Sequence, residues 1–405
     1  MGVPDDDLDL LTRDAGGFLR AAVEAAGGWL VAWRCGHLDH RPGRGTTAGY
    51  RVRVRWPGGT REERMGAATG RLPDGAFVLD DGGRRVAVWR FPHDPDLPGL
   101  PAAGDAATAG RLLSAMGLGA AGVRLRVRAY RPRRRAVVEA IGPRGRVFLK
   151  VVRPRRVVAL HERHRMLVAA GVPAPQSLGY TVDGVLALQA LPGVTLRDAL
   201  RRGDRRLPPA AAVLDLLDRL PAPLAEAPRR PSWADRADHY ASVVAAALPR
   251  TGGLARDLAA EVLESDVAGP VVPVHGDFYE AQLHVREGRI MGLLDIDTAG
   301  AGDRLDDLAC LLGHLSVLAQ IDRQRAPAIQ ALGARYLAAF ERTVDAADLR
   351  CRVAAVVLSL APGPHRVQDA DWPAATGRRL ALAGSWLASA RALRGVRPEK
   401  APLSA

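Results

Sequence analysis

The stretch VHGDFYEAQ occupies residues 274–282, and the stretch GLLDID follows at residues 292–297. Each comes at the end of a short apolar run that is typical of a buried strand, so we expect the carboxylates of Asp277 and Asp295 to emerge where strands end. Gln282 lies five residues after Asp277, and Asp295 lies thirteen residues after Gln282. A short loop and one hairpin would therefore bring two carboxylates and one amide to a single point.

This set of groups suits phosphoryl transfer from a nucleotide. In that reaction one carboxylate orients the attacking hydroxyl and takes its proton, while an oxygen ligand and a second carboxylate hold the magnesium ion that bridges the nucleotide phosphates. Asp277 fits the first role, and Gln282 with Asp295 fits the metal-binding role. Asp297 is either a further metal ligand or a turn residue. The simpler alternative for all the aspartates is that they are turn formers at strand ends.

At these residues the sequence resembles the aminoglycoside phosphotransferase and choline kinase family, whose signature is His-Gly-Asp, an amide five residues later, and an Asp that ends a hydrophobic strand. The segment GDRLDDLA at residues 302–309 resembles the family's entry into its next helix. Most members carry Asn where this chain has Gln282, whereas a maltokinase-like branch carries Gln. The resemblance implies an α+β, bilobal protein-kinase-like fold with ATP and Mg²⁺ as cofactors. It also implies that Asp277 is catalytic and that His275 braces its loop.

Two residues match the family's phosphate-binding pair by their spacing. Lys150 lies in the middle of an apolar strand predicted over residues 146–152, where an ammonium group is costly unless it is paired. Glu162 follows twelve residues later, in a helix predicted over residues 157–170. In the family, a strand lysine held by a helix glutamate contacts the α- and β-phosphates. The alternatives are that Lys150 extends to solvent from an edge strand and that Glu162 belongs to a charged helix face.

The resemblance also predicts where the rest of the nucleotide binds. The turn RPRRR at residues 131–135 occupies the position of a phosphate-covering loop but contains no glycine, so we expect the guanidinium groups of Arg133 and Arg134 to replace backbone amides there. The hinge between the lobes falls around Gln189 and Leu191, where backbone groups would contact the adenine edge.

We divide the chain into an N-terminal cap module (residues 1–103), a kinase-like N-lobe (104–191) and a helical C-lobe (192–405). The Pro- and Asp-rich segment at residues 91–101 marks the first boundary, because these residues disfavour helix and strand interiors. The cap begins with an amphipathic helix predicted over residues 8–26. Strands are predicted over 50–56, 77–79 and 85–89 in the cap and over 124–130, 136–141, 146–152 and 184–191 in the N-lobe, and helices over 106–118, 210–220, 232–248, 253–265, 305–319, 321–344 and 373–393.

Composition bounds the compartment and the partners. The chain has 405 residues, a formal net charge of +13 and three widely spaced cysteines, which favours a reduced, intracellular protein. The acidic start lacks a secretion signal and no apolar run is long enough for a membrane span, so we expect a cytoplasmic protein without a membrane partner. Fifteen Arg and Lys residues lie between Arg124 and Arg165. They suit a nucleotide triphosphate, a nucleic acid or a solvated face, and the lack of interleaved aromatic residues argues against nucleic acid.

The acceptor is less well defined than the reaction. The cap and Gln282 favour a sugar kinase. The loop QDADWP at residues 368–373 combines carboxylates with an indole, which suits sugar binding, and its simpler alternative is a helix N-terminal turn capped by Asp. The basic end from Arg391 to Lys400 argues against a polycationic acceptor. We predict an ATP-dependent O-phosphotransferase that acts on a small hydroxylated molecule, a sugar or aminosugar. The alternatives are a kinase for a peptide or protein hydroxyl and a nucleotide-binding regulator without turnover. The oligomeric state is not predicted.

Overall fold

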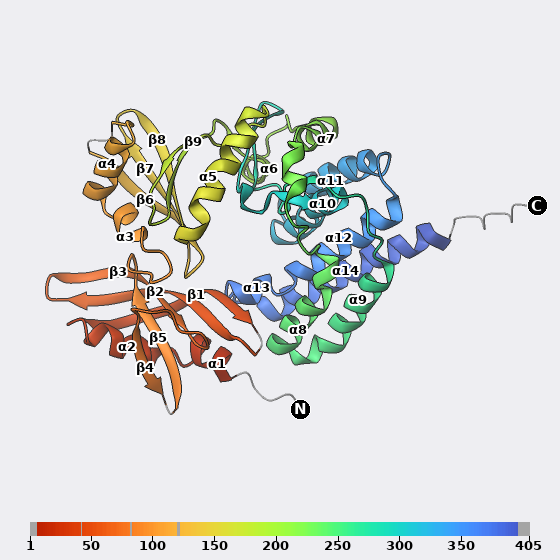
Figure 1. Ribbon diagram of the computed structural model, residues 1–405. Coiled ribbons are helices and arrows are strands. Elements are labelled where there is room, and N and C mark those ends of the chain that lie inside the picture. The colour runs from red at the N-terminus through yellow and green to blue at the C-terminus, as the bar shows by residue number, and fades with distance from the viewer. Residues whose placement is uncertain (1–5, 42, 82, 120–121, 396–405) are drawn as a thin grey trace, which may run out of the picture. The chain divides into compact units, whose positions relative to one another are not determined.

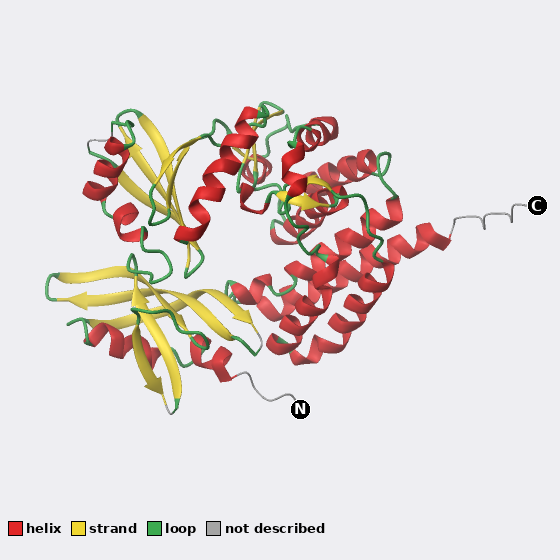
Figure 2. Ribbon diagram, viewed as in Figure 1, coloured by secondary structure: helices red, strands yellow, loops and turns green. Residues whose placement is uncertain are grey.

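The structure is a computed structural model that describes residues 6–41, 43–81, 83–119 and 122–395 (Figure 1). The acidic start at residues 1–5 and the basic residues Arg397 and Lys400 lie outside the described residues. Backbone contacts divide the chain into two compact units. The first contains Met1–Val168, Pro175–Ala190 and Pro364–Trp372, and the second contains Ala169–Ala174, Leu191–Gly363 and Pro373–Ala405. Strands predominate in the first unit and helices in the second (Figure 2).

The first sheet of the first unit is antiparallel, with strand order β1-β2-β3-β5-β4. One face of β2 is buried at Tyr50, Val52 and Val54, as its alternating sequence predicts. These residues pack with residues of two short helices, and the Tyr50 hydroxyl donates a hydrogen bond of 2.7 Å to the carbonyl of Leu11. The elements are α1 (Asp6–Thr12), α2 (Gly16–Glu24), β1 (Trp29–Arg41), β2 (Gly45–Trp56), β3 (Gly59–Ala68), β4 (Phe77–Asp81) and β5 (Arg84–Arg90).

The single helix predicted over residues 8–26 is wrong, because the chain leaves the helical path between Thr12 and Gly16 and forms α1 and α2 instead. The pair Gly16-Gly17 has a low helix propensity, which favours a break at this point. The strands β1 and β3 were not predicted at all. The exposed first half of β3 is made of Gly, Thr, Arg and Glu residues, so it shows no alternation of apolar and polar residues.

The second sheet is also antiparallel, with order β6-β7-β8-β10-β9. One face is apolar and contributes Val138, Leu149, Val151 and Ala187 to a core that also contains residues of α3 and α4, including Leu113. Lys150 lies on β8 between two apolar neighbours that face this core, so its side chain faces the opposite side. The elements are α3 (Leu100–Gly104), α4 (Ala106–Ala115), β6 (Arg124–Arg131), β7 (Arg135–Gly142), β8 (Gly145–Val152), α5 (Pro154–Ala169), β9 (Ser177–Tyr180) and β10 (Val185–Gln189).

The second unit is mainly helical, with α10 packed against α11 and α12, and α9 packed against α8 and α12. Small strand pairs carry the two stretches quoted first above: β12 pairs with β15, and β13 pairs with β14 and β11. The elements are β11 (Val194–Thr195), α6 (Leu196–Arg202), α7 (Ala210–Asp218), η1 (Ala222–Glu226), η2 (Ala234–Arg236), α8 (Ala237–Ala247), η3 (Pro249–Thr251), α9 (Gly252–Ser265), β12 (Val272–Val274), β13 (Leu283–Arg286), β14 (Arg289–Leu293), η4 (Ile296–Thr298), β15 (Gly300–Gly302), α10 (Arg304–Ile321), α11 (Ala326–Phe340), α12 (Ala346–Leu360) and α14 (Trp372–Gly395). The short helix α13 (Gly363–Arg366) belongs, apart from Gly363, to the first unit.

The helix predicted over residues 321–344 is shorter than expected, because α10 extends to Ile321 and α11 begins only at Ala326. The sequence prediction missed α12 altogether. This helix begins where the Asp345 carboxylate accepts hydrogen bonds from the amides of Ala347 and Asp348. Most of its residues are buried, so it lacks the one-sided apolar pattern by which a surface helix is recognised.

A buried arginine joins α12 to the start of α10. Arg352 is 1% exposed. Its Nη1 donates a hydrogen bond of 2.6 Å to Asp306, its Nη2 lies 3.3 Å from Asp303, and its Nε pairs with Asp266. Burial raises the pKa of Asp306 to about 6, whereas Arg352 acts in the opposite direction, which indicates that this carboxylate is costly to bury without the guanidinium group.

We predict that Arg352→Met destabilises the second unit by about 3–5 kcal/mol, because buried carboxylates then lose their counterion. Chemical unfolding followed by circular dichroism measures this loss. The matched control is Arg391→Met, since the Arg391 side chain pairs with Glu261 but is 60% exposed, and a surface pair of this kind contributes at most about 1 kcal/mol. Equal losses in the two variants would contradict this account of Arg352.

Candidate active site

The catalytic loop predicted around Asp277 begins directly after β12 and turns sharply at Gly276. Gly276 has a φ of 78°, and a Cβ atom at this position would lie 2.8 Å from the carbonyl oxygen of Thr298. Only glycine combines this left-handed backbone conformation with so close an approach. The middle residue of the His-Gly-Asp stretch is therefore required by the turn that presents Asp277.

Asp307 holds this turn from α10. Its carboxylate accepts hydrogen bonds from the amides of His275, at 2.7 Å, and Gly276, at 2.8 Å. Asp307 is 1% exposed. Burial raises its pKa, while the hydrogen bonds from the two amides act in the opposite direction. One buried carboxylate thus satisfies two adjacent backbone N–H groups, and it fixes the path of the loop immediately before Asp277.

His275 connects the two conspicuous stretches of the sequence. It is fully buried. Its Nε2 lies 2.8 Å from the carbonyl oxygen of Leu294, and its Nδ1 accepts from the amide of Asp277 at 3.3 Å. These partners require a neutral ring with the proton on Nε2. Thr298 adds a hydrogen bond of 2.9 Å from its hydroxyl to the His275 carbonyl. The His275 ring therefore lies between the loop and the end of β14, which is the position expected for a bracing residue.

The three predicted metal ligands flank the β13–β14 hairpin, with Gln282 directly before β13 and with Asp295 and Asp297 after β14. Gln282 is 5% exposed and is fixed through its backbone, which donates to Tyr279 and accepts from Leu294. Asp295 follows β14 in a left-handed conformation, with φ 51° and ψ 50°. A non-glycine residue in this conformation is strained, and such strain is common at functional sites. Asp297 lies in η4 and is 7% exposed.

Tyr279 feels the charge of both carboxylates that the sequence predicts for the site. Burial raises the pKa of Tyr279, and the charges of Asp277 and Asp295 raise it further. A carboxylate from each stretch therefore lies within electrostatic range of the same phenol. Gln282, Asp295 and the candidate Asp297 offer oxygen donors of the kind that Mg²⁺ prefers, so their chemistry fits a magnesium ion, and their metal-binding role stays a prediction.

Sequence reasoning missed several groups around Asp277. The ring of Tyr279 stacks on His314 with centroids 4.2 Å apart, and the guanidinium group of Arg197 lies 5.6 Å from the Tyr279 centroid. Arg197 also pairs with the fully buried Glu280 at 2.7 Å. Burial lowers the pKa of His314 to about 3, so its imidazole is neutral. Glu280 lies within the stretch at residues 274–282, but no sequence pattern indicates that it pairs with Arg197, which lies 83 residues earlier.

Lys150 and Glu162 belong to the first unit. Lys150 is 6% exposed and lies on the interior strand β8, opposite Val137 of β7 and Leu186 of β10. The edge-strand alternative for Lys150 is therefore wrong. The Glu162 side chain is 57% exposed and lies 3.6 Å from Arg165 and 3.8 Å from His161. Its contact with Lys150 remains a prediction.

The predicted phosphate-covering turn is held by aspartates that precede it in the chain. Arg133 has a left-handed φ of 62°, and its amide donates to Asp94 at 2.7 Å. Its side chain donates to Asp96 at 2.7 Å and to the carbonyl of Arg71 at 2.8 Å. Asp94 also accepts from the Tyr130 hydroxyl at 2.8 Å. The turn therefore keeps its strained, glycine-free conformation through contacts with residues 71–96.

The second arginine of this turn is also paired, because Arg134 lies 3.4 Å from Asp39. Arg153 completes the arrangement by contacting Asp96 at 3.2 Å and the carbonyl of Arg133 at 3.0 Å. The phosphate-binding roles of Arg133 and Arg134 remain predictions. A nucleotide phosphate would have to take the place of the carboxylates at these guanidinium groups.

The hinge residues fall on either side of the boundary between the units, with Gln189 in the first and Leu191 in the second. The amide of Gln189 donates to the carbonyl of Gln176 at 2.9 Å. The side chain of Leu191 packs so closely on Gly292 that a Cβ atom there would lie 2.3 Å from it. Their predicted contacts with adenine remain predictions.

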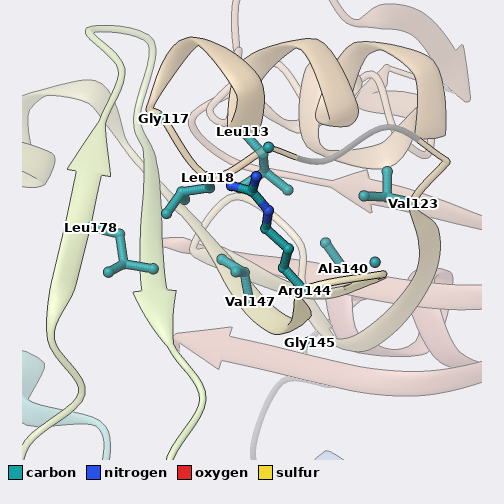
Figure 3. Close-up of a pocket in the computed structure, with 11 residues that line it drawn as sticks. Leu113, Gly117, Leu118, Val123, Ala140, Arg144, Gly145, Val147 and Leu178 are labelled. Carbon is teal, nitrogen blue, oxygen red and sulfur yellow. The ribbon is translucent and has the colours of Figure 1, made fainter.

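A pocket of about 280 Å³ lies in the first unit, lined by residues of α4, the β7–β8 hairpin and β9 (Figure 3). Its walls include Leu113, Val147 and Leu178, and the side chain of Arg144 extends along it. Val147 lies on the same side of β8 as Leu149 and Val151, whereas Lys150 faces the other side. This pocket is therefore separate from the predicted phosphate-binding face.

The strand-end carboxylates, the braced loop and the antiparallel sheet that carries a buried lysine define a phosphotransferase with a protein-kinase-like α+β fold. The chain belongs to the phosphotransferase enzyme family, whose pattern matches residues 128–350. The predicted family and fold class are thereby confirmed. The comparisons do not support the maltokinase-like branch specifically, and it stays a prediction. No protein of curated function matches the sequence.

Similar solved structures include two aminoglycoside phosphotransferases and one macrolide phosphotransferase. APH(3'')-Id from Streptomyces rimosus is 20% identical, with 62% of this chain and 98% of that chain covered and a TM-score of 0.44. A thermostable mutant of APH(4)-Ia with AMP-PNP and hygromycin B is 14% identical, with coverages of 70% and 99% and a TM-score of 0.49. The macrolide 2'-phosphotransferase MphH from Brachybacterium faecium is 20% identical, with coverages of 68% and 98% and a TM-score of 0.43. The family assignment rests on the sequence match alone.

Among the described residues, no helix is both long enough and apolar enough to span a membrane. The expected cytoplasmic location stays a prediction.

We predict that Asp307→Ala lowers turnover by about 100-fold, because two loop amides lose their acceptor and Asp277 is misplaced. The variant should remain folded by circular dichroism, and magnesium-dependent ADP release measures its turnover. Asp307→Asn is the matched variant, since it keeps one carbonyl oxygen as an acceptor, and its loss should be smaller. Wild-type turnover in Asp307→Ala would contradict the positioning role.

Proposed function

We propose that the protein is an ATP-dependent O-phosphotransferase that phosphorylates a hydroxyl group of a small molecule. The observation that carries this proposal is the catalytic loop, in which Asp277 follows a glycine-dependent turn that Asp307 and His275 hold on either side. Membership of the phosphotransferase enzyme family supports it.

In the proposed reaction, the acceptor hydroxyl oxygen forms a bond to the γ-phosphorus of ATP. The bond between this phosphorus and the bridging β-phosphate oxygen breaks, and ADP leaves. Asp277 orients the hydroxyl and takes its proton. Gln282 and Asp295 would hold Mg²⁺, with Asp297 as a further candidate ligand, and the ion neutralises the charge on the β- and γ-phosphates when it is bound.

We propose that Lys150 contacts the α- and β-phosphates, with Glu162 as its partner when nucleotide is bound. Arg133 and Arg134 would take phosphate in place of Asp96 and Asp39, their present partners. Backbone groups at Gln189 and Leu191 would contact adenine. The acceptor in this proposal is a sugar or aminosugar, which rests on Gln282 and on the basic C-terminal end of the sequence.

A second candidate is a nucleotide-binding regulator without turnover. It is favoured by one observation, the pairing of both turn arginines with carboxylates. In such a protein the arginines would stay with Asp96 and Asp39, and nucleotide would bind without being used.

We predict that one pool of acceptors stimulates magnesium-dependent ADP release from ATP. The pools are maltose and other sugars, aminosugars, aminoglycosides, choline and hydroxyl-bearing peptides. Asp277→Asn should reduce the stimulated rate by at least about 100-fold, because the amide cannot take the proton. Nucleotide binding without ADP release in every pool would favour the regulator, and stimulation that persists in Asp277→Asn would contradict the role of this residue.

We also predict that Lys150→Ala weakens ATP binding by about tenfold or more, because a buried ammonium group that contacts phosphates is lost. Titration with a fluorescent ATP analogue measures this change. Arg146→Ala is the matched control on the same strand, since its side chain is 51% exposed and it should bind nucleotide normally. Equal effects of the two substitutions would indicate a general loss of positive charge.

A further inference from the structure

Two side chains of α10 lie beside the catalytic aspartate without a role in the proposed reaction. Cys310 and His314 are four residues apart, so they lie on the same face of α10, one turn from each other. Ligand atoms of Asp277, Cys310 and His314 all lie within 4.8 Å of one another. We propose that these three residues form a binding site for Zn²⁺ or a similar divalent transition metal, and that the bound ion inhibits the enzyme.

The geometry of the cluster requires only a modest contraction to bind zinc. A tetrahedral zinc ion with bonds of about 2.0–2.3 Å places its ligand atoms roughly 3.3–3.8 Å apart. The two α10 ligands are fixed by the helix, and the His314 ring is held by stacking on Tyr279. Asp277 lies in a loop, so rotation of its side chain supplies the remaining movement.

The access route and the donor atoms favour this class of metal. Cys310 is fully buried, whereas Asp277 and His314 are half-buried, so an ion enters beside the carboxylate and the imidazole. On binding, the Cys310 S–H bond breaks, its proton passes to water, and a sulfur–metal bond forms. No oxidant or reductant takes part. Sulfur and imidazole nitrogen select zinc-like ions, whereas Mg²⁺ prefers the oxygen donors of Gln282 and Asp295.

The inhibitory consequence rests on the proposed function. A carboxylate that coordinates zinc cannot accept the proton of an acceptor hydroxyl, and the ion occupies the space that the acceptor needs. Metal binding itself does not depend on the proposed reaction, so the two can be tested separately.

Cobalt titration of the tag-free, full-length protein tests the site without any assay of activity. We expect the d–d absorption of tetrahedral Co²⁺ and a thiolate-to-cobalt charge-transfer band in the near ultraviolet, at about one ion per chain. Cys310→Ser should abolish the charge-transfer band and lower zinc affinity by about tenfold or more. Cys351→Ser is the matched control, because Cys351 is another buried free cysteine of the second unit, and its band should be unchanged. Lack of the band in the wild type, or its survival in Cys310→Ser, would overturn the proposed site.

The activity arm compares zinc inhibition of ADP release in the wild type and in Cys310→Ser, which should keep its basal turnover. We expect the substitution to raise the inhibitory zinc concentration by about tenfold or more. Equal inhibition of both proteins would overturn the inhibitory role. If the wild type releases no ADP with any acceptor, the proposed function fails, while the cobalt spectrum still decides whether the metal site exists.

Discussion

The conformation of the loop that we propose to be catalytic depends on the carboxylate of Asp307. Two consecutive amides, those of His275 and Gly276, donate to its two oxygens at 2.7 and 2.8 Å. Burying a charged carboxylate costs free energy. For Asp307 this cost is partly offset because the residue lies in the first turn of α10, where the helix dipole favours a negative charge. The backbone before Asp277 is thereby fixed to a helix rather than left to a flexible loop, which suits a reaction that depends mainly on positioning.

The first turn of α10 is in turn held by Arg352 of α12, which pairs with Asp303 and Asp306. The three acidic residues at the start of α10 therefore have two different roles. Asp303 and Asp306 anchor α10 to α12, and Asp307 anchors the proposed catalytic loop to α10. Strain on the other side of the site, at the left-handed Asp295, is tolerated because His275 and Gln282 both hold the backbone of Leu294.

The sequence was sufficient for the loop and the fold class, because the His-Gly-Asp turn, the strand ends and the spacing to Gln282 are local features. It was insufficient where distant segments meet. Asp307 was quoted only as part of a helix entry, since nothing local shows that it accepts two amides from a loop 31 and 32 residues earlier. The aspartates that hold Arg133 lie 37 and 39 residues away, and α12 is buried on most sides, so its pattern was not that of a surface helix.

The most direct test of the account is to follow the phosphoryl group itself. Candidate acceptors are incubated with ATP whose γ-phosphoryl oxygens are labelled with oxygen-18, and the products are analysed by mass spectrometry. The account predicts that one hydroxylated small molecule gains a phosphoryl group that carries the label, and that Asp277→Asn does not form this product. Label that appears only in inorganic phosphate, at the same rate in the wild type and in Asp277→Asn, would contradict it.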